Sequence, residues 1–208
     1  MATAPARFNL FSPRAKLSVD FSSVGEGFDM KTWLVASFLA SFALTGAAIA
    51  GAPQPTKPVD PARFFQGRWY EIGRKPMSLT DGCVAGWTEY APGDQGRIKV
   101  LDACYDKTPA GKVKTLGGPA DILDPASHAK LAVHYRFAGF IPVTQDYWIL
   151  DHDDDYTWFI EADPTFDKLW IYTRAANPSP ELLRDLIKKA QGFGYDTSKL
   201  EFPTQTGK

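Results

Sequence analysis

The chain has 208 residues, of which 44% are apolar and 13% aromatic, a composition typical of a globular protein. Its 23 lysines and arginines nearly balance 24 aspartates and glutamates, so no face collects the positive charge that nucleic-acid binding needs. These figures favour about one domain and argue against nucleic acid as a partner.

The first 50 residues have the pattern of a leader. Lys31 follows Met30, an apolar run covers residues 33–49, and small residues end it at Ala48 and Ala50. A basic start, an apolar stretch and a small-residue cleavage site predict a secretory signal peptide over residues 30–50. We therefore expect Met30 to be the true start, residues 1–29 to be a disordered upstream extension, and the protein to be exported. The alternative is an uncleaved membrane anchor of similar length.

Residues 51–61 form an extended lead-in, because their prolines prevent a helix. The remaining 62–208 alternate mostly with a period of two, which is typical of strands. Turn residues such as Pro92-Gly93 and Asp124-Pro125 separate the strands. The expected strands are 67–74, 83–90, 97–105, 112–122, 129–137, 146–151, 156–162 and 168–174. Strands joined by short turns predict an antiparallel meander that must close on itself or cover its edges.

One helix is expected near the C-terminus. Ser179 can cap it, Pro180 suits its first position, and Gly192 ends it. Its leucines, Ile187 and Ala190 form an apolar stripe, so the helix should pack on the outside of the sheet. A short last strand at 199–202 could pair with the first strand.

The two cysteines are expected to form a disulfide. Counted about the turn at residues 92–96, Cys83 falls opposite Cys104 on the neighbouring strand. Such a bond is compatible with export and would add about 3 kcal/mol of stability in the chain-entropy model. The alternative is a pair of buried free thiols.

Three motifs occur in order along the chain: Gly67-x-Trp69 in GRWYEIGR, Asp155-Tyr156 in a late hairpin, and Arg174 at the end of LWIYTR. Together they resemble the lipocalin family, specifically its bacterial and apolipoprotein D-like branch, over about residues 60–202. Asp154 departs from this pattern, since the family often has threonine there.

The resemblance implies an all-β fold, an eight-stranded antiparallel up-and-down barrel with one C-terminal α-helix packed outside. It also implies that Trp69 and Arg174 stack at the closed end, with Gly67 allowing their close approach. The role of these motifs would be structural, leaving the other end of the barrel open to a small ligand. For an exported protein of this branch we expect the periplasm, or the periplasmic face of the outer membrane.

Strand alternation and the resemblance assign the ligand-binding residues. If Arg174 points inward, Trp170 and Tyr172 do so as well. The resemblance adds Trp148 and Leu150, and an opposite apolar wall is expected from the alternating residues Leu131, Val133, Tyr135 and Phe137. For each of these, plain core packing is the alternative. The expected function is the binding, and the transport or storage, of a fatty acid, lysophospholipid or related membrane-derived lipid, with a role in envelope maintenance.

Two other functions remain open, a lipocalin-type enzyme acting on a lipid or isoprenoid and a membrane-docking interaction protein. No nucleophile or phosphate motif is present, and His128, His134 and His152 lack metal-ligand spacing. The run of alternate aspartates at 151–155 lacks the glycine and glutamate of a calcium loop. We therefore expect no catalytic residue, metal or cofactor. If it shares the inward direction of Trp69, Glu71 would be a buried carboxylate near the barrel floor. Such a group can act as an acid or a base, but more often it bonds a polar neighbour.

Membrane docking would use Phe140 and Ile141 in the turn that precedes Pro142. The expected partners are thus a small hydrophobic ligand and, in this alternative, a membrane surface. Both a monomer and a homodimer are compatible with the sequence.

Overall fold

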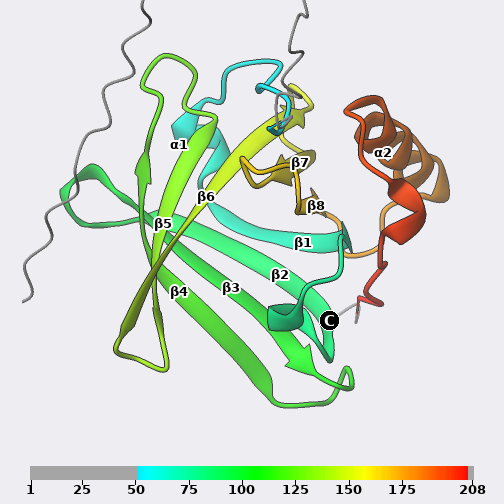
Figure 1. Cartoon of the computed structure of the whole chain (residues 1–208), viewed down its shortest axis with the longest axis horizontal. Coiled ribbons are helices and arrows are strands. Elements are labelled where there is room, and N and C mark those ends of the chain that lie inside the picture. The colour runs from blue at the N-terminus through cyan, green and yellow to red at the C-terminus, as the bar shows by residue number, and fades with distance from the viewer. Residues whose placement is uncertain (1–50, 206–208) are drawn as a thin grey trace, which may run out of the picture. The chain divides into compact units, whose positions relative to one another are not determined.

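Period-two segments build the described part of the chain. The computed structural model describes residues 51–205, so the expected extension and signal peptide lie outside the described residues. Eight strands close into an antiparallel barrel in which each strand pairs with the next and β8 returns to β1 (Figure 1). The strands are β1 (Gly67–Arg74), β2 (Cys83–Pro92), β3 (Ile98–Asp106), β4 (Val113–Ile122), β5 (Lys130–Phe137), β6 (Ile141–His152), β7 (Trp158–Ala162) and β8 (Leu169–Thr173). The predicted fold class is confirmed.

Two strand boundaries differ from the prediction by more than one residue at their N-terminal ends. β6 begins at Ile141, five residues earlier than expected, because it pairs with β5 from the turn onward. Residues 141–144 are exposed, so no burial pattern marks them in the sequence. β7 begins two residues later than expected, because Tyr156 has a positive φ of 54° and so cannot belong to an extended strand.

The lead-in runs along the barrel wall. The backbone N–H of Thr56 donates to the carbonyl of Leu150 at 2.9 Å, and that of Val59 donates to Ser127 at 2.8 Å. A short helix that the sequence analysis did not predict, α1 (Pro61–Phe64), follows. The Asp60 carboxylate accepts from the Ala62 N–H at 3.0 Å and caps this helix, whose last residue Phe64 is fully buried.

Helix α2 (Pro180–Gly192) confirms the predicted C-terminal helix. Ser179 Oγ accepts from the Leu182 N–H at 3.1 Å, and Leu186 and Ala190 are fully buried. They pack in an outer cluster that covers the outside of β6, β7 and β8, and whose members on those strands are Leu150, Trp158, Ile160, Ala162, Leu169 and Ile171. The expected last strand is reduced to one bridge, Arg74 with Glu201, after a 3₁₀ turn at Thr197–Lys199.

The predicted disulfide between Cys83 and Cys104 is present and joins β2 to β3. The register used to predict it is wrong. Cys83 faces Asp106, and the register shifts between Val84 and Trp87 at a bulge. This bulge holds Ala85 at a φ of 48°, and it changes which residues of β2 and β3 face each other.

The barrel interior is filled at one end. An interior cluster of buried apolar side chains contains Trp69, Phe159, Tyr172, Leu131 and Val133, together with Phe64 from α1. The Phe159 and Tyr172 rings stack with centroids 4.7 Å apart. The space for a ligand must therefore lie nearer the other end.

Candidate ligand-binding site

The closed end is built around Trp69 and Arg174, the pair implied by the family resemblance. The Arg174 guanidinium carbon lies 3.5 Å from the centroid of the Trp69 ring. Its Nη1 also donates to the carbonyls of Gln66 at 2.7 Å and Arg68 at 2.9 Å. Gly67 has a φ of +64°, and a Cβ on it would lie 3.5 Å from Arg174 Nη1. The expected contact is present, and it fixes the entry of the chain into β1.

The second motif ties the lead-in to the same end. Tyr156 is buried and its hydroxyl accepts from the Asp60 N–H at 2.8 Å, while its ring stacks on His152 at 4.7 Å. Asp155 beside it is exposed. The neighbouring Asp153 carboxylate accepts from the Trp158 N–H at 3.1 Å, as in a hairpin tip closed by a side chain.

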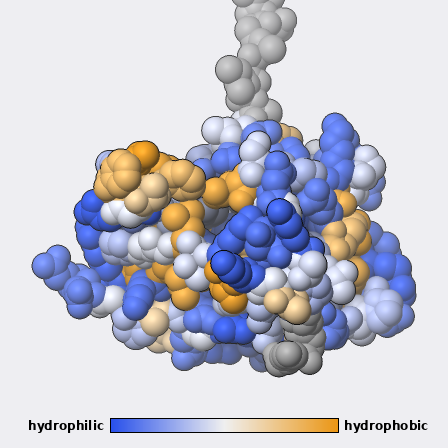
Figure 2. Space-filling view, turned by 90° about the horizontal axis from the view of Figure 1, so that it is seen from below, coloured by the Kyte–Doolittle hydropathy of each residue, from blue (hydrophilic) through white to orange (hydrophobic). Residues whose placement is uncertain are grey.

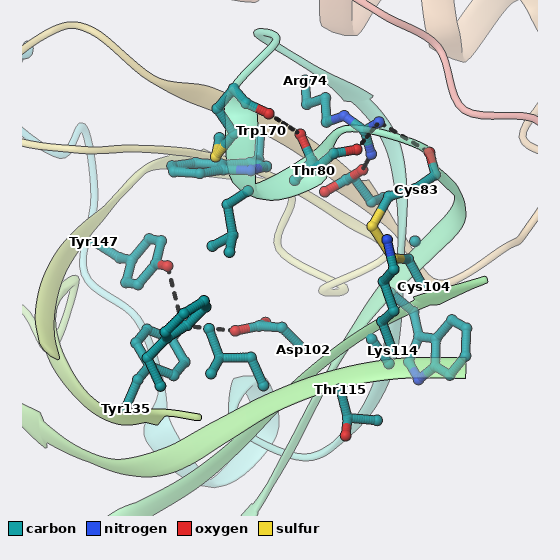
Figure 3. A pocket seen from close by; sticks show the side chains of 18 of the residues that line it. Arg74, Thr80, Cys83, Asp102, Cys104, Lys114, Thr115, Tyr135, Tyr147 and Trp170 are labelled. Carbon is teal, nitrogen blue, oxygen red and sulfur yellow. Dashed lines mark hydrogen bonds and ion pairs between the residues drawn. A yellow bond between two sulfur atoms is a disulfide. The ribbon is translucent and has the colours of Figure 1, made fainter. Parts of the chain in front are cut away.

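A cavity of about 430 Å³ occupies the other half of the barrel (Figure 3). Its wall is formed by every strand except β7, mainly in the halves nearer the open end. The turns that follow β1 and β5 complete it. Its apolar and aromatic lining consists of Met77, Leu79, Trp87, Ala103, Leu116, Tyr135, Phe137, Ala138, Tyr147 and Trp170. Two carboxylates, Glu71 and Asp102, also line it, as do the cations Arg74, Lys114 and Arg136.

The structure divides the eight predicted ligand-binding residues into three groups. Tyr135, Phe137 and Trp170 line the cavity. Leu131, Val133 and Tyr172 point into the barrel but belong to the packed interior cluster beyond the cavity. Trp148 and Leu150 do not point into the barrel at all.

The placement of Trp148 and Leu150 corrects the sequence analysis. Both pack in or against the outer cluster, whereas Tyr147 and Ile149 of the same strand face the interior. Because α2 covers the outer face of β6, both faces of this strand are apolar, and alternation does not reveal which one points inward. Tyr147 is the cavity residue that this error concealed.

Three carboxylates lie inside the barrel, of which the sequence analysis singled out Glu71 alone. Glu71 is buried as expected and pairs with Arg74 Nη1 at 2.6 Å. Asp102 accepts from the Tyr135 hydroxyl at 2.6 Å, and this hydroxyl lies 3.0 Å from that of Tyr147. Glu161 is 4% exposed and lies opposite Trp170 across the β7–β8 pair.

A simple count would have found the other two carboxylates. Asp102 follows the buried Val100 by two residues, and Glu161 follows the buried Phe159 by two, so each shares the inward face of its strand. They were missed because charged residues are normally assigned to the solvent face of a strand.

Burial controls the protonation of this polar group. Loss of solvation raises the pKa of Glu71 and of Asp102, opposed at Glu71 by the charge of Arg74 and at Asp102 by the Tyr135 hydrogen bond. The pKa of Glu161 is raised well above its usual range, first by burial and then by the charge of Asp102. Burial also raises the pKa of Tyr135 and Tyr147, so both hydroxyls stay neutral donors.

Metal-binding clusters and membrane-spanning helices can be assessed for residues 51–205. No group of three or more histidine, cysteine, aspartate or glutamate side chains in this range is arranged to hold a metal ion. No helix in the same range has the length and apolar content that crossing a bilayer requires.

Comparison with known proteins decides the family. The lipocalin-like domain family matches residues 59–205, more than half of the chain. The chain belongs to the lipocalin family. Within it, the chain is 36% identical to temperature-induced lipocalin-1 of Arabidopsis thaliana over 147 residues, covering 68% of this chain and 77% of that protein.

The lipocalin relatives include the expected branch. The outer membrane lipoprotein Blc of Vibrio cholerae is 26% identical over 170 residues, covering 80% of this chain and 95% of that protein. Rabbit apolipoprotein D is 31% identical over 161 residues, covering 73% of this chain and 82% of that protein. Among solved structures, insecticyanin of the tobacco hornworm Manduca sexta superposes with a TM-score of 0.58 at 19% identity. The superposition covers 75% of this chain and 87% of insecticyanin. This last likeness agrees with the barrel fold.

Proposed function

We propose that this lipocalin binds a small, largely apolar molecule in the cavity at the open half of its barrel. The observation that carries the proposal is the cavity itself, whose volume of about 430 Å³ lies within the usual range for small-molecule sites. Its wall is mostly apolar and aromatic, and burying each methylene there is worth about 0.8 kcal/mol before ordering costs. Family membership supports the same class of ligand.

The finer proposal is a membrane-derived lipid, of which fatty acids and lysophospholipids are the class expected from the sequence. The apolar side chains at the mouth support it. Phe137 and Leu79 line the cavity while remaining 50% and 59% exposed, so an acyl chain meets apolar surface from the rim inward.

Tryptophan fluorescence tests this proposal. Lysophospholipid or fatty acid is titrated into the protein below its micelle concentration, and saturable quenching or a blue shift is expected because Trp170 lines the cavity. Trp170→Phe should reduce this response, and the remainder should come from Trp87, which also lines the cavity. Trp148→Phe is the matched control and should keep it, since Trp148 packs outside. Absence of binding by calorimetry to every acyl ligand tried would overturn the proposal.

A second candidate function is docking to a membrane surface, and a specific observation favours it. Exposed large apolar side chains gather at the open end: Leu79, Val113, Phe137, Phe140, Ile141 and Val143. Among the described residues the other two of this kind are Leu123, in the turn after β4, and Phe202, which follows the bridge between Glu201 and Arg74. Figure 2, which views this end, shows apolar surface concentrated on one side. A rim of this kind can enter the boundary between headgroups and acyl chains.

Liposome flotation tests docking. Phe140, 72% exposed, is changed to aspartate, and the bound fraction should fall severalfold. Leu123→Asp is the control, because Leu123 is 48% exposed in the β4–β5 turn at the closed end. Equal flotation of both variants and the unchanged protein would overturn docking through this rim while leaving cavity binding standing.

We propose that the protein acts outside the cytoplasm, in the periplasm or at the periplasmic face of the outer membrane. The Cys83–Cys104 disulfide supports an oxidising compartment. The name of the Vibrio cholerae relative supports the outer membrane, and the signal-like residues 30–50 support export. Cell fractionation with the full chain tests it, and a wholly cytoplasmic, reduced protein would overturn it.

A further inference from the structure

Two of the three interior carboxylates lack a counterion. Glu71 is neutralised by Arg74 at 2.6 Å. For Asp102 and Glu161, no lysine, arginine or histidine within residues 51–205 comes within 4.0 Å of a carboxylate oxygen. A carboxylate removed from water without a cationic partner is costly, and a positive charge supplied from outside lowers that cost. The barrel therefore offers a position for a cation.

The Asp102 carboxylate is open to the cavity. It lines the cavity wall and accepts a hydrogen bond from the Tyr135 hydroxyl at 2.6 Å. The ring of Trp170 lies 5.3 Å from that of Tyr147. Figure 3 shows Asp102, Tyr135, Tyr147 and Trp170 around the same space. A cation placed there would meet both a carboxylate and the faces of aromatic rings.

Glu161 adds negative character to the same interior. It is 4% exposed and points inward from β7 beside Trp170, although it does not itself line the cavity. Its Oε2 is buried without a hydrogen-bond partner in the part of the chain that the structure describes. A buried acceptor left unpaired is rare in proteins.

The remaining cations of the cavity do not fill this position. Arg74 pairs with Glu71 and Glu201, and Lys114 Nζ lies 2.8 Å from Asp106. Arg136 is exposed beside the mouth. An anionic ligand that placed its head at the mouth would press its apolar tail against Asp102. An anionic head placed inward would face like charge, so the inner end of the cavity favours a cation over an anion.

We propose that the cavity selects amphiphiles that carry an ammonium group, with the ammonium held inward between Asp102 and the aromatic rings and the apolar chain directed to the mouth. This inference rests on the proposed binding function and specifies the charge of the ligand. The ammonium donates to the Asp102 carboxylate and lies over the rings of Trp170 and Tyr147. A fatty acid lacks this group.

Calorimetry with three probes of equal chain length tests the inference at pH 7: octylamine, octanol and octanoate. Octylamine should bind at least tenfold more tightly than octanol, and octanoate should bind most weakly. Asp102→Asn should reduce the advantage of octylamine over octanol to less than threefold, because the ratio of the two affinities reports the contact with the ammonium. Asp121→Asn is the matched control, because Asp121 pairs with Arg97 and His134 and does not line the cavity.

The outcomes separate the two proposals. Octanol or octanoate binding as tightly as octylamine would overturn the ammonium site and leave the proposed function intact. Failure of all three probes, together with the acyl ligands above, would overturn the proposed function and this inference with it. The comparison among probes on the unchanged protein needs no variant, so it decides the matter even if Asp102→Asn does not fold.

Discussion

Gly86 of β2 lies directly against the carboxylate of Glu71 on β1. A Cβ on Gly86 would stand 2.9 Å from Glu71 Oε1 and 3.3 Å from its carboxyl carbon. The carboxylate cannot move away freely, because Arg74 holds it at 2.6 Å. The bulge that ends at Gly86 therefore provides the space in which the buried ion pair sits.

Gly86→Ala should displace that ion pair. We expect a loss of about 1 to 3 kcal/mol in the free energy of unfolding, the usual cost of overpacking a buried site. Urea unfolding measures it. Gly192→Ala at the end of α2 is the control, since nothing lies within 4 Å of the added Cβ, and its stability should change by less than about 0.5 kcal/mol. Equal stability of both variants would contradict this account.

Arg174→Lys should weaken the closed end although it keeps the positive charge. Lysine lacks the planar fork that reaches the Gln66 and Arg68 carbonyls while lying over Trp69. We expect a loss of about 1 to 2 kcal/mol by urea unfolding. Arg184→Lys, on the exposed face of α2, should have almost no effect. A closed end that tolerates lysine fully would show that charge alone matters there.

Glu161→Gln should stabilise the protein above acidic pH. The pKa of Glu161 is raised in the fold, so the folded state binds its proton more tightly than the unfolded state. The stabilisation that the protonated Glu161 contributes is therefore fully present below the ordinary glutamate pKa of about 4.5, which applies to the unfolded chain. It is lost as the pH rises toward the raised pKa of the folded state. The gain from Gln should accordingly grow across that range, to about 1 to 3 kcal/mol.

The measurement for Glu161 is urea unfolding from pH 4 upward. Asp185→Asn on the exposed face of α2 serves as the control and should change stability little at any pH. A gain from Glu161→Gln that is the same at all pH values would rule out an ionised Glu161 as its cause.

Reducing the Cys83–Cys104 bond should destabilise the barrel without abolishing its fold. The bond closes a segment with a sequence separation of 21, which corresponds to about 3 kcal/mol in the chain-entropy model. The double variant Cys83→Ser, Cys104→Ser should lower the free energy of unfolding by a similar amount and remove its sensitivity to reductant. A variant as stable as the oxidised protein would contradict this expectation.

The sequence was sufficient for the fold because its signals are local. Alternation, turn residues and the Ser179 cap act within a few residues of each other, and strand β1 and helix α2 were predicted with the observed boundaries. The bulge at Ala85 was not predictable, since no local pattern shows where a strand gains a residue. The disulfide was therefore predicted correctly from an incorrect register.

The cavity was harder to predict because it depends on which face of each strand is covered from outside. Alternation from Arg174 placed Trp170 at the cavity, and the alternation of its own strand placed Tyr135 there. Trp148 was assigned to the cavity by the resemblance, and alternation could not correct this because α2 makes the outer face of β6 as apolar as the inner one. Asp102 and Glu161 escaped notice because charged residues are normally assigned to the solvent face of a strand, and because only the closed barrel brings Tyr135 to Asp102.

Because Trp69, Phe159 and Tyr172 fill the barrel near its closed end, the cavity that remains toward the open end is short. A guest with a long chain cannot be enclosed completely, and its far end must emerge among Phe137 and its neighbours. That protruding end is accessible while the remainder is still held. If the proposed function holds, transfer of the guest to a bilayer would begin at this protruding end, before the guest has been released.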